Sequence, residues 1–177
     1  MRETSIMGKH SIRENKNIYQ LCREEKGLTR EKASEQMAGV SASRIEKIEY
    51  ELQEPTPYDI VQMSDCYKHP DLCNYYCSHK CAIGARYVPE VEINELPNII
   101  LETIASLNEI NPLTSRLIQI ARDGKITDDE IKDFAFISKK FDEVSLAIDS
   151  LNLWVDKTAG ENNINLELLR AEKEKLK

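Results

Sequence analysis

Apolar side chains recur at intervals of three and four residues along the first part of the chain, which is the spacing of one face of an α-helix. The pattern predicts helices at about residues 17–26, 29–38, 41–52 and 57–67, and Pro70-Asp71 opens a fifth, cysteine-rich segment. The residues expected to face inward are Ile18, Leu21, Cys22, Ala33, Met37, Val40, Ile45, Ile48, Leu52, Ile60, Val61 and Met63. We therefore expect an all-α protein whose N-terminal domain has about five helices.

The C-terminal part carries a longer helical pattern. Two helices are expected between Pro97 and Gly124, and a third begins at Thr127, whose hydroxyl can cap it. Its apolar seam repeats at alternating spacings of three and four and consists of Phe134, Ile137, Phe141, Val144, Ile148, Leu151 and Val155. Short connections favour antiparallel neighbours, so we expect a helical hairpin or a three-helix bundle, with a seam regular enough to continue across a two-fold axis. Residues 158–160 are expected to end this helix.

Residues 28–55 hold the most specific pattern in the chain. Thr29 and Ser41 are positioned to cap two short helices, and Gly39 follows the first of them, where a positive φ is often needed. The buried positions of the second helix leave Ala42, Ser43, Arg44 and Lys47 on its outer face. Small residues followed by two cations suit a helix that enters a DNA major groove, which is about 12 Å wide.

This segment resembles the phage-repressor-like helix-turn-helix family (Cro-type, XRE). The matching residues are Leu28, Thr29, Ala33, Val40, Ser41, Ile45, Ile48, Glu49 and Pro55. The resemblance covers about the first 70 residues and implies a DNA-binding transcriptional regulator, repressor-like, whose recognition helix spans about residues 41–52. It implies base-edge contacts from Ser41, Ser43, Arg44 and Lys47, with Ala42 on the same DNA-binding face, and phosphate contacts from Arg23, Thr29 and Arg30.

The segment departs from the family pattern at several positions. Glu51 stands where the family usually has Gly, and Arg30 stands where it usually has Gln. Glu46 and Glu54 add negative charge near the recognition helix, whereas Glu49 matches a family position thought to be structural. These carboxylates bear on the affinity for DNA more than on the fold.

The composition argues against several other classes of function. The net charge of −7 arises after residue 54, because residues 1–54 hold ten Lys or Arg and ten Glu. No apolar run approaches the ~20 residues of a membrane span and no signal-peptide core is present, so we expect a cytoplasmic protein without membrane contacts. With three His, no Gly-rich phosphate loop and no recognisable nucleophile setting, we expect no enzymatic activity.

Four of the five cysteines lie close together, at Cys66, Cys73, Cys77 and Cys81. Crowding of this kind is typical of metal or redox chemistry in a reducing compartment, so these thiols are the candidate ligands of zinc or of an iron–sulfur cluster. Their spacing matches no common zinc or cluster pattern. Buried thiols on the inner face of a helix, and a disulfide or redox switch, are the alternatives.

Three segments follow from these patterns. Residues 1–84 form the predicted helix-turn-helix domain, residues 85–96 a linker, and residues 97–177 a helical domain for dimerisation or for a protein partner. The first hypothesis is a homodimeric regulator that binds double-stranded DNA. The alternatives are a protein-interaction module that keeps the fold without DNA binding, and a metal- or redox-responsive regulator that uses the cysteines.

Overall fold

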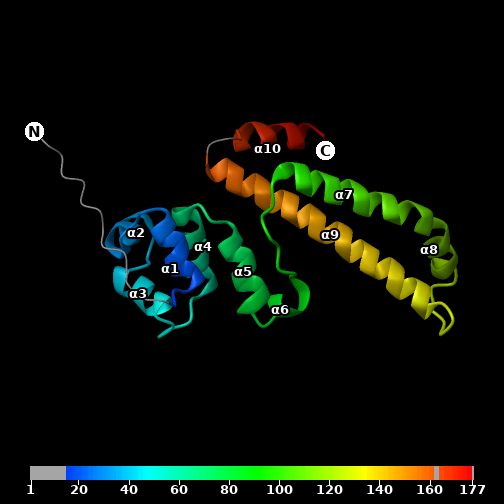
Figure 1. Cartoon of the computed structure of the whole chain (residues 1–177), viewed down its shortest axis with the longest axis horizontal. Helices are drawn as coiled ribbons and strands as arrows, with labels where there is room; N and C mark the ends of the chain where they lie inside the picture. Colours follow the sequence, from blue (N-terminus) through cyan, green and yellow to red (C-terminus); the bar gives the residue numbers. More distant parts are fainter. Residues whose placement is uncertain (1–14, 162–163, 177) are drawn as a thin grey trace, which may run out of the picture. The chain divides into compact units, whose positions relative to one another are not determined.

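The computed structural model describes residues 15–161 and 164–176, and every regular element in these ranges is a helix (Figure 1). The all-α prediction is therefore confirmed. The helices fall into two compact units, one comprising residues up to Glu90 together with Ala159–Lys177, and the other Val91–Thr158. Among the described residues, no helix combines the length and the apolar character that crossing a membrane requires.

The first unit contains seven helices within the described ranges. They are α1 (Ile18–Glu25), α2 (Arg30–Gln36), α3 (Ala42–Glu49), α4 (Pro57–Tyr67), α5 (Asp71–His79), α6 (Gly84–Tyr87) and α10 (Leu166–Lys175). The first four begin at side-chain caps, because Asn17, Thr29, Ser41 and Thr56 each accept a hydrogen bond from a backbone N–H of the following turn. Polar residues at these positions thus fix where each helix starts.

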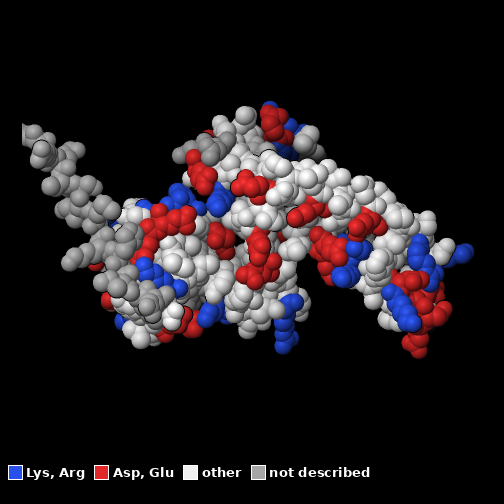
Figure 2. Space-filling model, in the orientation of Figure 1, with Lys and Arg blue, Asp and Glu red and all other residues white. Residues whose placement is uncertain are grey.

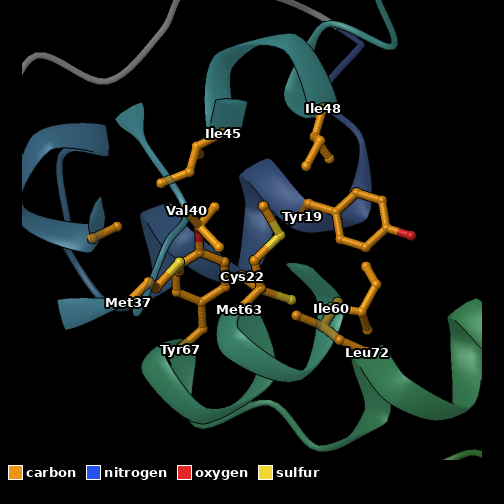
Figure 3. Close-up of a cluster of buried hydrophobic side chains, with 11 residues drawn as sticks. Tyr19, Cys22, Met37, Val40, Ile45, Ile48, Ile60, Met63, Tyr67 and Leu72 are labelled. Atoms are coloured by element: carbon orange, nitrogen blue, oxygen red, sulfur yellow. The ribbon is translucent and has the colours of Figure 1, made fainter. Parts of the chain in front are cut away.

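Eleven buried side chains from α1 to α5 and the α2–α3 connection form one core (Figure 3). Ile45 and Ile48 point from α3 into this core, and Met63 and Tyr67 enter it from α4. Cys22 lies among them on α1 and is 5% exposed. The apolar stripes of five short helices therefore meet in a single cluster, which none of these helices could bury alone.

Three side chains expected to face inward lie outside this core. Leu21 is 51% exposed, Val61 47% and Leu52 74%. The prediction for Leu52 fails because α3 ends at Glu49, and Glu51 then turns the chain with a φ of +56°. A residue in this left-handed conformation redirects the backbone, so a helical spacing no longer applies to Leu52.

The second unit is an antiparallel helical hairpin. One arm consists of α7 (Leu96–Ile110), the 3₁₀ helix η1 (Asn111–Leu113) and α8 (Thr114–Ala121), and the other is α9 (Ile131–Gly160), which belongs to this unit up to Thr158. Three contacts show that the arms run antiparallel. Ser150 donates to the Glu92 carbonyl, Lys140 pairs with Glu109 at 2.6 Å, and Arg116 pairs with Asp133 at 2.6 Å.

The apolar seam of α9 is only partly buried. Ile137 and Val144 are covered, whereas Phe141 is 45% exposed and Ile148 46%. The buried stripe continues instead through Ala147 and Ser150, because one arm covers only one side of the seam. The helix begins later than predicted, at Ile131, and it ends at Gly160, within the residues 158–160 that were expected to end it.

Candidate nucleic-acid interface

Helices α2 and α3 pack against each other across the connection 37–41. Gly39 has a φ of +73°, which allows the sharp turn between them. Side chains close the connection, since Ser34 donates to the Val40 carbonyl at 2.9 Å and Tyr58 to the Ala38 carbonyl at 3.1 Å. The angle between the two helices is therefore held by α4 as well as by their own contact.

A buried carboxylate ties α3 to the two helices before it. Both oxygens of Glu49 accept hydrogen bonds from Arg23, at 2.5 and 2.9 Å, and Oε2 also accepts one from Arg30 at 2.8 Å. The Arg30 guanidinium lies 4.9 Å from the centre of the Tyr50 ring. Partial burial alone would lower the pKa of Arg30, but its contacts with Tyr50 and Glu49 outweigh this effect and raise it.

This arrangement corrects the role assigned to Arg23. Arg23 is 6% exposed and also donates to the Leu28 carbonyl at 2.6 Å, so its guanidinium is committed to the interior. The phosphate contact predicted for Arg23 is therefore wrong. Arg30 keeps partial exposure, with 21% of its side chain accessible, and also approaches Glu46 at 3.3 Å.

Arg44, predicted at a base edge, is held by α4 and by the connection before it. It donates to both oxygens of Asp59, at 2.7 and 3.4 Å, and to the Glu54 carbonyl at 2.8 Å. Asp59 also forms a capping box with Thr56 at the start of α4. Burial alone would raise the pKa of Asp59, but the hydrogen bonds from Arg44 and Thr56 outweigh burial and lower it.

The remaining predicted contacts lie on the outer side of the helix pair. Ser41, Ser43 and Lys47 are exposed, and Ala42 and Thr29 are half-buried. The hydroxyls of Thr29 and Ser41 accept hydrogen bonds from the backbone N–H of Lys32 and Arg44, so they also serve as helix caps. The exposed part of the first turn of α3 is thus small and polar, with one lysine a turn further along.

Two structural residues were assigned no role in this site by the sequence pattern alone. Glu49 entered only through the family resemblance. Asp59 was missed, although the Thr56-x-x-Asp59 spacing of a capping box could have identified it. Figure 2 shows Lys and Arg intermixed with Asp and Glu over the first unit on the face in view. Glu31 and Lys32 on α2 and Glu46 and Lys47 on α3 are exposed, so charge of both signs lies on the helix pair itself.

The four clustered cysteines do not converge in the described residues. Cys66 lies on α4 with its sulfur 3.7 Å from the Gln36 side-chain oxygen, and Cys81 accepts a hydrogen bond from the Gly84 N–H at 3.4 Å. Burial raises the pKa of the Cys66 and Cys73 thiols, which disfavours their reactive thiolate forms. Across the described ranges, three or more potential metal ligands meet within 4.8 Å only at Cys22, His69 and Asp71.

Comparison with known proteins found no matching family model, no matching curated protein and no matching solved structure.

Proposed function

We propose that the protein is a sequence-specific regulator that binds double-stranded DNA through α3. The observation that carries the proposal is the outer face of α3, where Ser41, Ala42, Ser43 and Lys47 share a helix whose opposite face is fixed by Ile45, Ile48 and Glu49. A narrow, polar helix face on a rigid support can enter a major groove without rearrangement. The family resemblance of residues 28–55 supports the same function.

Within this proposal, the three arginines have different roles. Arg23 is structural, and Arg44 positions the start of α3 through Asp59, because both guanidinium groups are engaged inside the unit. Ser41, Ser43 and Lys47 then contact base edges. Thr29 and the exposed part of Arg30 contact phosphates. Arg44 contacts DNA only if its bond to Asp59 opens.

A second copy of the chain completes the proposed regulator. The second unit leaves apolar side chains of α7 and α9 exposed, including Ile104, Leu107, Phe141 and Ile148. Pairing of two such hairpins would cover these residues in a four-helix arrangement. A dimer would bind two half-sites about 34 Å apart, one turn of DNA.

The first test is selection of bound sequences from a random DNA pool at low and at moderate salt, with the full chain. Enrichment of a palindrome whose half-sites lie about one turn apart is the expected result. Lys47→Ala should then weaken binding to the selected site by about 1–3 kcal/mol and relax the preference at one base pair. Lys125→Ala, in the exposed turn before α9, is the matched control with unchanged binding.

Arg44→Gln separates the positioning role from a base contact. If Arg44 is a positioning residue, the substitution should weaken binding evenly across sequences. If it contacts a base, the substitution should relax the preference at one position of the selected site. Equal affinity of Lys47→Ala and the original protein for the selected site would contradict the proposed docking of α3.

A protein-interaction module is the second candidate function. It is favoured by one observation, namely that Arg23, Arg30 and Arg44 all pair with carboxylates of the same unit and leave few cations for phosphates. This function predicts no enrichment of any sequence at either salt concentration, since non-specific and specific binding both depend on phosphate contacts.

A further inference from the structure

A thiol, an imidazole and a carboxylate meet in the first unit, away from the outer face of α3. Cys22 comes from α1, and His69 and Asp71 come from the connection between α4 and the start of α5. One donor atom from each lies within 4.8 Å of the other two. Cys22 is 5% exposed and His69 8%, so two of the three groups are withdrawn from water.

The backbone holds His69 in place opposite α1. Lys68 ends α4 in the left-handed conformation, with a φ of +58°, and thereby turns the chain back. The His69 N–H donates to the Ser64 carbonyl at 3.1 Å, and the His69 carbonyl accepts from the Leu72 N–H at 3.1 Å. The ring position is therefore set by secondary structure on both sides of the residue.

The two nitrogens of the His69 ring face different carboxylates. Nδ1 lies 3.2 Å from Asp71 Oδ1, and Nε2 lies 3.4 Å from Glu25 Oε2. Asp71 is mostly covered, with 28% of its side chain accessible, whereas 69% of the Glu25 side chain is accessible. One carboxylate thus belongs to the enclosed group and the other approaches the ring from solvent.

We propose that Cys22 Sγ, His69 Nδ1 and one Asp71 oxygen bind a single divalent transition-metal ion of the zinc type. Thiolate with imidazole favours zinc-like ions over magnesium or calcium, which prefer ligand sets made of oxygen. Tetrahedral zinc sites place such donor atoms about 3.3–3.8 Å apart. Nδ1 and Asp71 Oδ1 already lie 3.2 Å apart, and the 4.8 Å limit leaves a contraction of at most about 1.5 Å for the other separations. A water molecule takes the fourth position.

In this site the ion replaces protons. The Cys22 thiol loses its proton to solvent on binding, and His69 is neutral, with its remaining hydrogen on Nε2. That N–H donates to Glu25, an outer-shell contact that fixes the ring tautomer. The ion links the last turn of α1 to the α4–α5 connection, and the assignment does not depend on DNA binding.

The site differs from the one that cysteine spacing alone suggested. It uses Cys22, which stands apart in the sequence, and none of the four clustered thiols. This difference makes the two sites separable by substitution. Cys22→Ser removes a ligand of the proposed site, whereas Cys66→Ser is the matched control, because Cys66 is a partly buried thiol of the same unit outside the donor group.

The test is titration of the full chain, purified anaerobically and stripped with a chelator, with Co²⁺ followed by Zn²⁺. We expect one cobalt ion per chain with a thiolate-to-cobalt charge-transfer absorption that zinc displaces. Cys22→Ser should abolish this absorption, and Cys66→Ser and the triple variant Cys73→Ser/Cys77→Ser/Cys81→Ser should retain it. Absence of the absorption in the original protein, or its loss in the triple variant alone, would overturn the assignment.

Glu25 and Asp71 provide a second, graded comparison. Glu25→Gln should keep the charge-transfer absorption and weaken affinity by about 10- to 100-fold, as outer-shell substitutions do. Asp71→Asn should weaken the affinity for the metal ion more than Glu25→Gln does, because this substitution removes a ligand. The reverse order would exclude Nδ1 coordination.

One measurement needs no substitution, in case Cys22→Ser fails to fold. Zinc should slow alkylation of Cys22 selectively, as read by mass spectrometry of each cysteine, and leave the labelling of Cys66 unchanged. Equal labelling of Cys22 with and without zinc, on protein whose circular dichroism shows native helix content, would contradict the proposal.

Discussion

The two units of this protein bury apolar surface in different ways. In the first, eleven side chains from five helices and a connection close around one core. In the second, the described residues bury only six apolar side chains, Val91, Ile99, Ile120, Ile137, Val144 and Ala147. The same helical periodicity therefore leads to an enclosed core in one unit and to a single packed layer in the other.

The ion pairs also differ in burial between the two units, being buried in the first and at the surface in the second. The ion pairs of Glu49 and Asp59 lie in the interior of the first unit, where their carboxylates also fix helix positions. In the second unit, Lys140–Glu109 and Arg116–Asp133 cross the surface of the hairpin. Buried pairs are costly to break, whereas surface pairs contribute little. The first unit should therefore tolerate substitution of its charges much less than the second.

The largest expected effect tests the buried pairs directly. Glu49→Gln leaves Arg23 and Arg30 without their shared carboxylate and should lower the free energy of unfolding by about 3–5 kcal/mol. Urea unfolding of the full chain, followed by circular dichroism, measures the change. Glu46→Gln, a few residues away and half exposed, should change it by less than about 1 kcal/mol.

A surface charge on the partly covered seam should act on association instead. Phe141→Glu places a carboxylate at the centre of the proposed dimer contact and should cost about 2–3 kcal/mol of association energy, which raises the dissociation constant 30- to 150-fold. Sedimentation velocity over a range of concentrations measures this constant. Ile126→Glu, in the turn outside the helices, is the control. A monomeric original protein would contradict the proposed dimer.

The Arg44–Asp59 pair predicts a dependence on pH. Asp59→Asn should destabilise the first unit by about 1–2 kcal/mol at pH 7, through loss of the ion pair and the capping box. The pKa of Asp59 is lowered in the folded protein, so its stabilisation is complete above its ordinary value of 3.8 and is lost as the pH falls through the lowered value. The difference between the two proteins should therefore shrink on acidification below pH 4.

The smallest expected effect is an increase in stability. Glu51 adopts a φ of +56°, a conformation that Gly reaches without steric cost. Glu51→Gly should raise the free energy of unfolding by about 0.5–1 kcal/mol. The substitution Gly39→Ala, at a φ of +73°, tests the converse and should lower stability by a similar amount. A destabilised Glu51→Gly variant would mean that the Glu51 side chain makes a contribution of its own.

Local signals in the sequence were sufficient for the starts of the first four helices and for the caps of α2 and α3. The predicted bounds 57–67 agree with α4, and Thr29 and Ser41 cap α2 and α3 as expected. Periodicity failed where a backbone turn intervened, as at Leu52, and where a single neighbouring arm covered only part of a seam, as at Phe141 and Ile148. Both failures depend on tertiary geometry, which spacing alone does not contain.

The candidate sites were predicted less completely for a related reason. Residue type identified Arg23 and Arg44 as cations, but their partners Glu49 and Asp59 lie 26 and 15 positions away. Cysteine crowding likewise pointed to Cys66, Cys73, Cys77 and Cys81, whereas the convergent donors join Cys22 to residues 69 and 71. Pairings at this separation are decided by how helices pack.

The attachment of α3 has a consequence for mutational tolerance. Its inner positions, Ile45, Ile48 and Glu49, carry the packing and the buried charges, and none of the exposed positions among Ser41, Ser43, Glu46 and Lys47 contributes to that core. Ser41 also caps the helix, so it is left unchanged. A library that randomises Ser43, Glu46 and Lys47 should retain a high fraction of folded members, whereas one that randomises the three inner positions should lose nearly all of them. The inner face of α3 thus fixes the helix, and its outer face can change in sequence without loss of the fold.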